Sequence, residues 1–217
     1  MSYHFIHVDR CATDLSFIAD KCRALRLEAL QQSPTSFSST WDIESRFSND
    51  VWVSRLRDPD RETFACVYQE GQTSAWVAQV SLRGPIPAED FRLPALSGQS
   101  RPLDDMEGER WQMLSLYTSV GHRGHGLGAK LCREAFHFIE RRLRSETENA
   151  TVRIMAKPEN TVAVGLYQRL GFIKTGLCTL EEALRANGDS DLLPTGELEE
   201  KYTTRSGIVM ALQLRKN

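Results

Sequence analysis

The sequence predicts a single α/β domain, and three observations predict it. Short apolar runs typical of strands alternate along the chain with longer segments of helical periodicity. The chain has 217 residues, 41% of them hydrophobic, and a domain of this size buries about 70% of its unfolded surface. A strand-like run over 111–118 passes through a glycine-rich turn into a helical pattern that begins at Leu127.

The first elements follow from local patterns. Residues 3–8 alternate and predict a strand. Residues 14–31 predict a helix, because its apolar residues recur at helical spacing. They are Leu15, Ile18, Cys22, Leu25 and Ala29. Residues 63–68 and 74–82 predict two strands of a hairpin whose turn contains Gly71.

The second half continues with a helix over about 128–144, a strand over 150–156 and a closing strand over 208–214. Two long connections interrupt this order. Residues 83–109 hold half of the eight prolines, and residues 176–207 contain a predicted short helix over 180–185. Connections of this length are either functional or disordered.

The glycine turn is the most informative stretch. A strand, a tight turn and a helix start point several backbone N–H groups and a positive helix end at one spot, which suits a phosphate or pyrophosphate. Glycines remove the side chains that would block the approach. They are Gly121, Gly124, Gly126 and Gly128. Their G-x-G-x-G spacing differs from the dinucleotide fingerprint, and 128–130 lacks the Gly-Lys-Ser/Thr of a P-loop, so both classes are disfavoured.

Two motifs carry a resemblance to a known family. The turn reads R-x-x-G-x-G at Arg123, Gly126 and Gly128, and residues 160–172 read N-x-x-A-x-x-L-Y-x-x-x-G-F. Together they resemble the GNAT superfamily of acetyl-CoA-dependent N-acetyltransferases, most strongly over 111–172. The resemblance implies one domain over 1–217 with a mixed, mostly antiparallel twisted sheet, flanked by helices, whose central strands splay apart. It also implies that 83–109 and 176–207 lie on the acceptor side.

The resemblance implies how acetyl-CoA is held. Backbone groups of Leu116 and Thr118 would contact the pantetheine arm and the acetyl oxygen, and the Asn160 amide would contact the pantetheine amides. The pyrophosphate would lie on the loop residues Arg123, Gly124, His125, Gly126, Leu127, Gly128 and Ala129. The Tyr167 hydroxyl would be the catalytic proton donor to the leaving thiolate. A helix cap at Asn160 and a core aromatic at Tyr167 stay as alternatives.

The general base stays open. Where many family members place an acid, this chain has Gln112 and Ser115. The remaining candidates are Glu44, Asp104, Asp105, Glu107 and Glu109. Acidic residues in the two connections are expected to favour a cationic amine by charge steering. They are Asp104, Asp105, Glu107, Glu197, Glu199 and Glu200.

Composition limits the partners. A formal net charge of −2 gives no reason to expect nucleic acid or an anionic membrane. The five cysteines are odd in number and form no C-x-x-C pair, and the N-terminus has no signal-peptide pattern, so we expect reduced thiols and a cytoplasmic protein. No metal site is predicted, and homo-oligomerisation stays open.

The prediction is therefore an N-acetyltransferase whose acceptor is a small-molecule amine and whose co-substrate is acetyl-CoA. Acetylation of protein N-termini or lysines is one alternative, although the two long connections argue against an open peptide groove. A non-catalytic acyl-CoA sensor is the other.

Overall fold

A computed structural model describes residues 2–99, 108–143 and 148–216. Its contacts cluster into two compact units. The first unit comprises Met1–Leu82 with Ser115–Phe138, and the second comprises Arg83–Leu114 with Ile139–Asn217. Within the described residues, no helix is long and apolar enough to cross a membrane.

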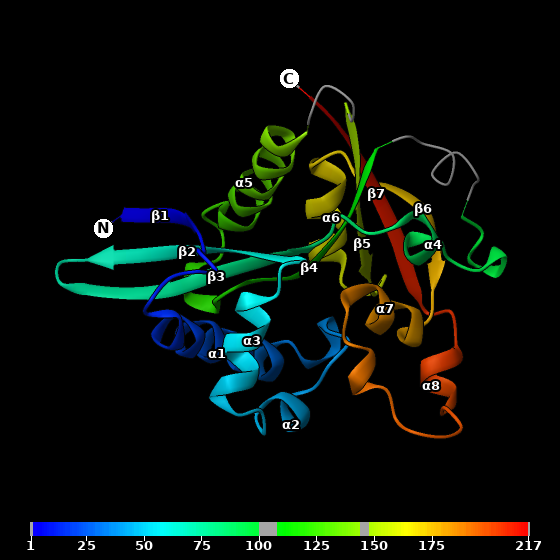
Figure 1. The fold of residues 1–217 in the computed structure, drawn as a ribbon, viewed down its shortest axis with the longest axis horizontal. Coiled ribbons are helices and arrows are strands. Elements are labelled where there is room, and N and C mark those ends of the chain that lie inside the picture. The colour runs from blue at the N-terminus through cyan, green and yellow to red at the C-terminus, as the bar shows by residue number, and fades with distance from the viewer. Residues whose placement is uncertain (1, 100–107, 144–147, 217) are drawn as a thin grey trace. The chain divides into compact units, whose positions relative to one another are not determined.

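The first unit contains the strands β1 (Ser2–His7), β2 (Arg61–Glu70) and β3 (Thr73–Arg83), followed by the end of β4 (Glu109–Thr118) (Figure 1). β1 runs antiparallel to β2, with Tyr3 opposite Tyr68. The turn between β2 and β3 contains Gly71, whose φ of 58° is costly for most residues but not for glycine. The predicted first strand and the hairpin are confirmed.

Helices cover both faces of these strands. On one side lie α1 (Leu15–Gln32), α2 (Trp41–Glu44) and α3 (Asn49–Arg57), with the 3-10 turn η1 (Pro34–Ser36) between the first two (Figure 1). On the other side lies α5 (Leu127–Arg142), which belongs to this unit as far as Phe138, and the Phe138 ring packs 5.7 Å from that of Phe64.

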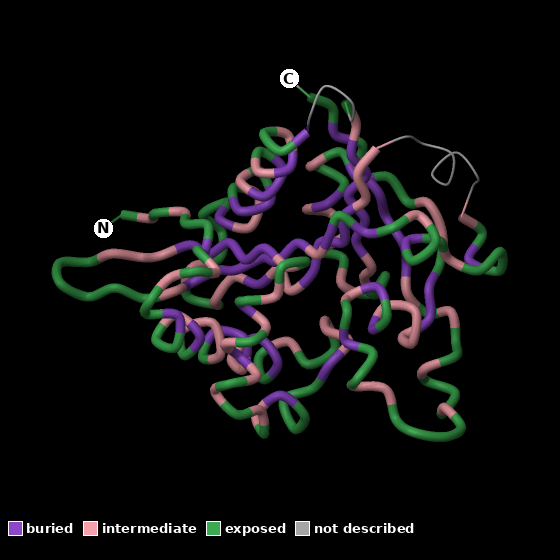
Figure 2. Tube along the Cα trace, in the orientation of Figure 1, coloured by how far each residue is buried: buried purple, intermediate pink, exposed green. Residues whose placement is uncertain are grey.

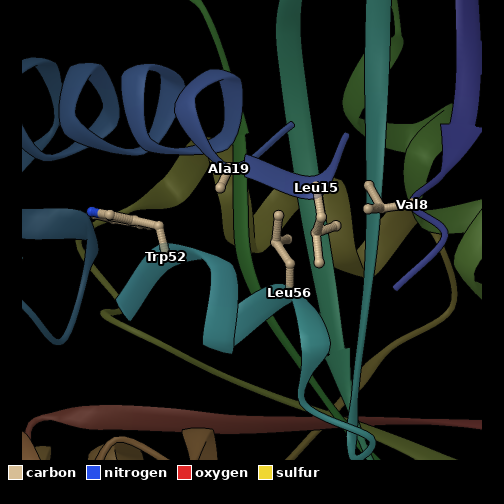
Figure 3. Close-up of a cluster of buried hydrophobic side chains, with 5 residues drawn as sticks. All are labelled: Val8, Leu15, Ala19, Trp52 and Leu56. Carbon is tan, nitrogen blue, oxygen red and sulfur yellow. The ribbon is translucent and has the colours of Figure 1, made fainter. Parts of the chain in front are cut away.

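An apolar cluster joins α1 to α3. Leu56 of α3 points toward Leu15 of α1, and Val8, directly after β1, lies beside Leu15 (Figure 3). Trp52 of α3 and Ala19 of α1 belong to the same cluster. All five side chains are buried, and buried chain runs along much of β2 and β3, whereas β1 is mostly exposed (Figure 2). Burial of such side chains is the main term that holds the two helices on the sheet.

The second unit contains the start of β4 with β5 (Asn149–Ala156), β7 (Gly207–Arg215) and β6 (Ile173–Cys178), hydrogen-bonded in that order. β4 and β5 are parallel, whereas β7 runs antiparallel to both of its neighbours. Because β4 contributes to both units, the strand order is β1-β2-β3-β4-β5-β7-β6. The mixed, mostly antiparallel open sheet with flanking helices is confirmed.

The pairing of β4 with β5 stops early. The register runs from Glu109 opposite Ala150 to Gln112 opposite Arg153, and no later pair joins the described residues of these two strands. β5 nevertheless pairs with β7 as far as Ala156 opposite Ile208. The two central strands therefore part after Gln112, as the splayed arrangement requires.

The remaining helices belong to the connections. Residues 83–109 contain α4 (Ala88–Phe91) and the turn η2 (Ala95–Ser97), while the predicted acidic residues Asp104, Asp105 and Glu107 lie outside the described part. After β5 come α6 (Thr161–Arg169), β6, α7 (Leu180–Asn187), the turn η5 (Ser190–Leu192) and α8 (Glu200–Thr203). The predicted short helix is α7, which is two residues longer at its C-terminal end than expected. A capping box between Thr179 and Glu182 starts it, and Gly188, at φ 77°, ends it.

Candidate active site

Hydrogen bonds fix the end of β4 and the loop after it within the first unit. The Ser119 amide donates to the Val77 carbonyl of β3 at 2.8 Å. After the turn η4 (Val120–His122), the Arg123 Nε donates back to the Thr118 carbonyl at 3.1 Å, and its guanidinium lies 5.6 Å from the Tyr117 ring centre. Arg123 therefore shapes the loop, and one lone pair of the Thr118 carbonyl is already in use.

The glycines of this loop make an open cradle at the start of α5. Gly124 and Gly126 have φ values of 82° and 71°. A Cβ added at either position, or at Gly121, would meet no atom of the described residues within 4 Å. Positive φ combined with open space is the backbone form that lets a ligand approach the main chain.

The amides behind this cradle lack helical acceptors. The Lys130 amide donates to the Gly126 carbonyl at 3.1 Å, which is the first helical bond of α5. The preceding amides of Leu127, Gly128 and Ala129 are those that a helix start leaves without an intrahelical partner. With the helix dipole behind them, they suit an anion such as pyrophosphate. The buried Leu127 side chain anchors the segment while residues 123–126 stay exposed.

Histidines brace the loop from within. The His125 Nδ1 lies 3.0 Å from the Arg123 carbonyl and 3.3 Å from that of His122. His122 in turn bonds to the Tyr3 hydroxyl through Nδ1 at 3.1 Å. The side chain of His125, one of the predicted cofactor-binding residues, thus contacts the loop itself, and its backbone is what faces the cradle.

A polar network that the sequence analysis did not identify fixes α1 to the end of β4. The hydroxyls of Tyr117 and Ser119 donate to the same carboxylate oxygen of Glu28, at 3.0 and 2.7 Å. Burial, and then the hydrogen bond to Glu28, raise the pKa of Tyr117 to about 12. This phenol therefore stays protonated at neutral pH. A glutamate on the inner side of α1 was the only sequence signal for it.

The second motif lies in the second unit. Asn160 caps α6, because its side-chain oxygen accepts from the Ala163 amide at 3.2 Å, so the helix-cap prediction is confirmed. Tyr167 is 7% exposed and its ring packs 5.4 Å from that of Phe172. The Phe172 amide donates to the Tyr167 carbonyl at 3.0 Å, across the turn that Gly171 makes at φ 95°. The motif thus builds the C-terminal turn of α6 and also places a tyrosine on it.

The candidate bases are engaged in other contacts. Glu44 is 1% exposed and accepts from Arg26 Nη2 at 2.6 Å and from Arg55 at 3.3 Å. Burial raises its pKa, but the two arginines outweigh burial and hold the pKa below its ordinary value. Glu109 accepts from the Trp111 indole at 3.0 Å and lies 3.5 Å from Arg142. Neither carboxylate is a free base.

Gln112 also has a structural role. It is buried, its Oε1 accepts from Arg153 Nε at 2.7 Å and its Nε2 donates to Asn187 at 3.2 Å. Arg153 itself is fully buried, and this burial lowers its pKa to about 10. Gln112 therefore does not act as a base; it accepts a hydrogen bond from the buried guanidinium of Arg153.

The predicted site residues fall into two groups. Those from Leu116 to Ala129 form one continuous segment of the first unit, and Asn160 and Tyr167 share α6 in the second. The acidic residues Glu197, Glu199 and Glu200 are exposed, and Glu199 pairs with Lys201 at 3.1 Å.

Comparison with known proteins gives a family. The family model described as the acetyltransferase (GNAT) family matches residues 25–172. A comparison with curated protein sequences gave no match.

Solved structures share the fold. The ribosomal-protein-S18-alanine N-acetyltransferase from Escherichia coli aligns over 100% of this chain and 96% of its own, at 15% identity and a TM-score of 0.53. NAA60 of Arabidopsis thaliana in complex with acetyl-CoA aligns over 98% and 99%, at 13% identity and a TM-score of 0.54. Spermidine N-acetyltransferase from Vibrio cholerae, in complex with CoA and spermine, aligns over 99% and 95%, at 14% identity and a TM-score of 0.53.

Proposed function

Because the chain belongs to the acetyltransferase (GNAT) family, we propose that it transfers the acetyl group of acetyl-CoA to the primary amine of a small molecule by direct attack of the amine. The observation that carries the proposal is the start of α5. There, open glycines at positive φ precede a helix whose first amides have no helical acceptor. A solved relative by fold, NAA60, is described with acetyl-CoA bound, which supports the same co-substrate here.

The residues present fit this co-substrate. The pyrophosphate would lie against the backbone of 123–129, where a Cβ at Gly124 or Gly126 has open space around it. Leu116 and Thr118 lie in the part of β4 that follows its last pair with β5, so their backbone groups are proposed to hold the pantetheine arm. Acetyl-CoA supplies the acetyl group as a thioester, which a neutral amine can attack.

Tyr167 is proposed as the proton donor to the departing thiolate. A phenol has an ordinary pKa near 10, so it carries its proton at neutral pH. The packing against Phe172 fixes the ring, which favours a defined direction for the hydroxyl. For the amine, we propose deprotonation through solvent, since Glu44 is held by two arginines and Glu109 by Trp111 and Arg142.

A thiol-release assay tests the proposal. Acetyl-CoA is offered with polyamines, amino acids, amino sugars, arylalkylamines and short peptides, and free coenzyme A is measured with a thiol reagent. We expect release that depends on one class of small amine. Acetyl-CoA binding without amine-dependent release from any class would favour the alternative of a non-catalytic acyl-CoA sensor.

Protein acetylation is the other candidate, and the names of two structural relatives favour it. One is described as acting on an alanine of ribosomal protein S18, and a RimL relative acts on the α-amino group of L7/L12. The spermidine enzyme represents small amines. At 8–15% identity these likenesses concern the fold, so the peptide arm of the assay decides.

The two connections are proposed to determine which amine is accepted, or how subunits pair. Long loops on a compact scaffold are more often specificity or interface elements than spacers. Shortening 83–109 and 176–207 separately should change the acceptor profile or the oligomeric mass and leave acetyl-CoA affinity as it is. The cytoplasmic location, inferred from the cysteine count, stays a prediction.

A further inference from the structure

A small cavity in the first unit has several polar and charged side chains in its walls. It lies among α1, α3 and the strands β2 to β4, and its volume is about 30 Å³. Three guanidinium side chains line it, from Arg26, Arg55 and Arg61, together with Gln79 and Ser115. No aspartate or glutamate of the described residues is among the lining residues. The lining therefore carries guanidinium charge, part of which Glu44 offsets by pairing with Arg26 and Arg55.

Arg26, one of the residues that line this cavity, has a donor that no group in the described residues accepts. The residue is 7% exposed, and its Nε and Nη2 hold the Glu44 carboxylate at distances of 3.2, 3.1 and 2.6 Å. Its third nitrogen, Nη1, is buried and has no hydrogen-bond partner among the described residues. A buried donor without a partner is costly, and one on a charged group is the most costly kind. Such a donor is expected where a ligand supplies the acceptor.

Gln79 is a second buried polar group on the wall. It is 3% exposed, and its Oε1 has no partner in the described part of the chain. A rotation of the side-chain amide by about 180° exchanges Oε1 and Nε2, so that the Nε2 donors then occupy the position of Oε1. Arg26 and Gln79 together can then offer N–H groups from α1 and from β3 to one acceptor group.

The position of Ser115 connects the cavity to the reaction. Ser115 lines the cavity, and it directly precedes Leu116, one of the proposed backbone contacts of the acyl group. Its φ of 58° is the only positive φ of a non-glycine residue in the described ranges. Such a conformation is strained for a residue other than glycine, and strained residues of this kind cluster at functional sites. Because consecutive Cα atoms are about 3.8 Å apart, the cavity wall at Ser115 and the proposed backbone contact at Leu116 are adjacent in the chain.

We propose that this cavity binds the carboxylate of the acceptor, and hence that the acceptor is a small amine of amino-acid type. That the bound molecule is the acetyl acceptor rests on the proposed function. Binding of an anion in the cavity does not depend on it. A guanidinium N–H donates a charge-assisted hydrogen bond to a carboxylate, which is stronger than the bond that a neutral polar group makes.

The kinetic test uses matched acceptors. Phenylalanine, leucine and lysine are each compared with the corresponding amide and with the amine left after decarboxylation. A charge-assisted hydrogen bond in a buried site should favour the acids by roughly 10- to 100-fold in kcat/KM. Equal kcat/KM for the acid, the amide and the decarboxylated amine would overturn the proposal, as would acetylation of peptides alone.

The variant Gln79→Glu tests the site directly. It places a carboxylate of the same shape where the ligand is expected, within reach of the arginines, and it should reduce the preference for acids over decarboxylated amines at least tenfold. The matched control is Gln31→Glu, the same change on an exposed residue of α1, which should keep the preference of the wild type. Unfolding temperatures of both variants verify that each is folded.

A binding measurement separates this proposal from the proposed function. Without acetyl-CoA, phenylalanine, leucine and lysine should raise the unfolding temperature of the wild type, the corresponding amides should not, and Gln79→Glu should remove the effect. If no amine releases thiol but the acids still stabilise the protein in this pattern, acetyl transfer fails and the anion site stands. If thiol release is found with no shift from any acid, the anion site fails.

Discussion

Replacing Gly126 by aspartate should abolish acetyl-CoA binding while the protein stays folded. Gly126 has a φ of 71° and open space where a Cβ would go, so the new side chain enters the cradle and displaces no protein atom. Its carboxylate would share the cradle with the negative charge of the pyrophosphate. At an effective dielectric constant of about 20, two like charges at about 5 Å repel by about 3 kcal/mol. The dissociation constant should therefore rise by at least roughly 100-fold.

The chain offers a matched control in Gly71→Asp. Gly71 has a φ of 58°, and a Cβ there also meets nothing within 4 Å among the described residues, but it lies in the β2–β3 turn. Both variants gain one negative charge, and both put an L-residue in the left-handed region at a cost of about 1–2 kcal/mol. They should unfold at similar temperatures, and only Gly126→Asp should lose affinity.

Titration calorimetry with acetyl-CoA at two ionic strengths completes the test. Because the loss at Gly126→Asp is electrostatic in part, higher salt should recover some of the affinity. A folded Gly126→Asp variant that binds acetyl-CoA as tightly as Gly71→Asp would refute the assignment of the loop to the pyrophosphate.

Three further outcomes are expected. Tyr167→Phe should lower kcat about 10²- to 10⁴-fold and leave acetyl-CoA affinity unchanged, because the ring still packs on Phe172 and only the proton is lost; unchanged single-turnover rates would make Tyr167 a packing residue. Glu44→Gln should lower the unfolding free energy in urea at pH 7 by about 3 kcal/mol, since it leaves buried guanidinium charge without its carboxylate. The folded pKa of Glu44 is lowered, so this difference should shrink as the pH falls below about 4.5, where the unfolded carboxyl gains its proton. Burial raises the pKa of Cys132 from 9.0 to about 12, so stability should fall as the pH rises above 9, and Cys132→Ala should weaken that dependence in thermal melts at pH 8 and 10.

Local patterns predicted those elements whose apolar residues are regular. The glycine turn, the helix after it and the strands around it were found because their signals lie within a few residues of one another. Asn160 was predicted to cap a helix, and it does so at 3.2 Å from the Ala163 amide. The two family motifs could be recognised for the same reason, because each of them is a continuous stretch of the sequence.

Other features could not be predicted from the sequence, because they depend on residues that are far apart in the chain. α3 carries two buried apolar residues, Trp52 and Leu56, among polar and charged ones, so its sequence alone is weakly helical; packing against α1 stabilises it. The pairing of Glu44 with Arg26 joins residues 18 positions apart, and the Glu28 network spans 89 positions. The positive φ of Ser115 has no sequence signature, because serine is not a residue that favours it.

The sequence did contain one sign of the arginine cavity. Arg26 follows Leu25 on the inner side of α1, within the stripe that Cys22 and Ala29 continue, and a charge on a buried helix face requires a partner. Glu44 is that partner, but it occupies only Nε and Nη2. A purely structural ion pair would be expected to satisfy both sides, as the fork of a guanidinium allows.

Burial of the apolar cluster offsets the free-energy cost of the unpaired polar atoms in the cavity wall. Trp52 and Leu56 belong to the cluster of Figure 3 and also line the cavity, so the same α1–α3 contact supports both. Each fully buried aliphatic or aromatic side chain of the cluster stabilises the protein by about 1.5–3 kcal/mol, and each buried polar group without a partner costs about 1–3 kcal/mol. Five apolar residues can therefore offset the unpaired atoms of Arg26 and Gln79. Because an apolar pair in their place would be no less stable, the polar walls are better explained by a bound anion than by the stability of the fold.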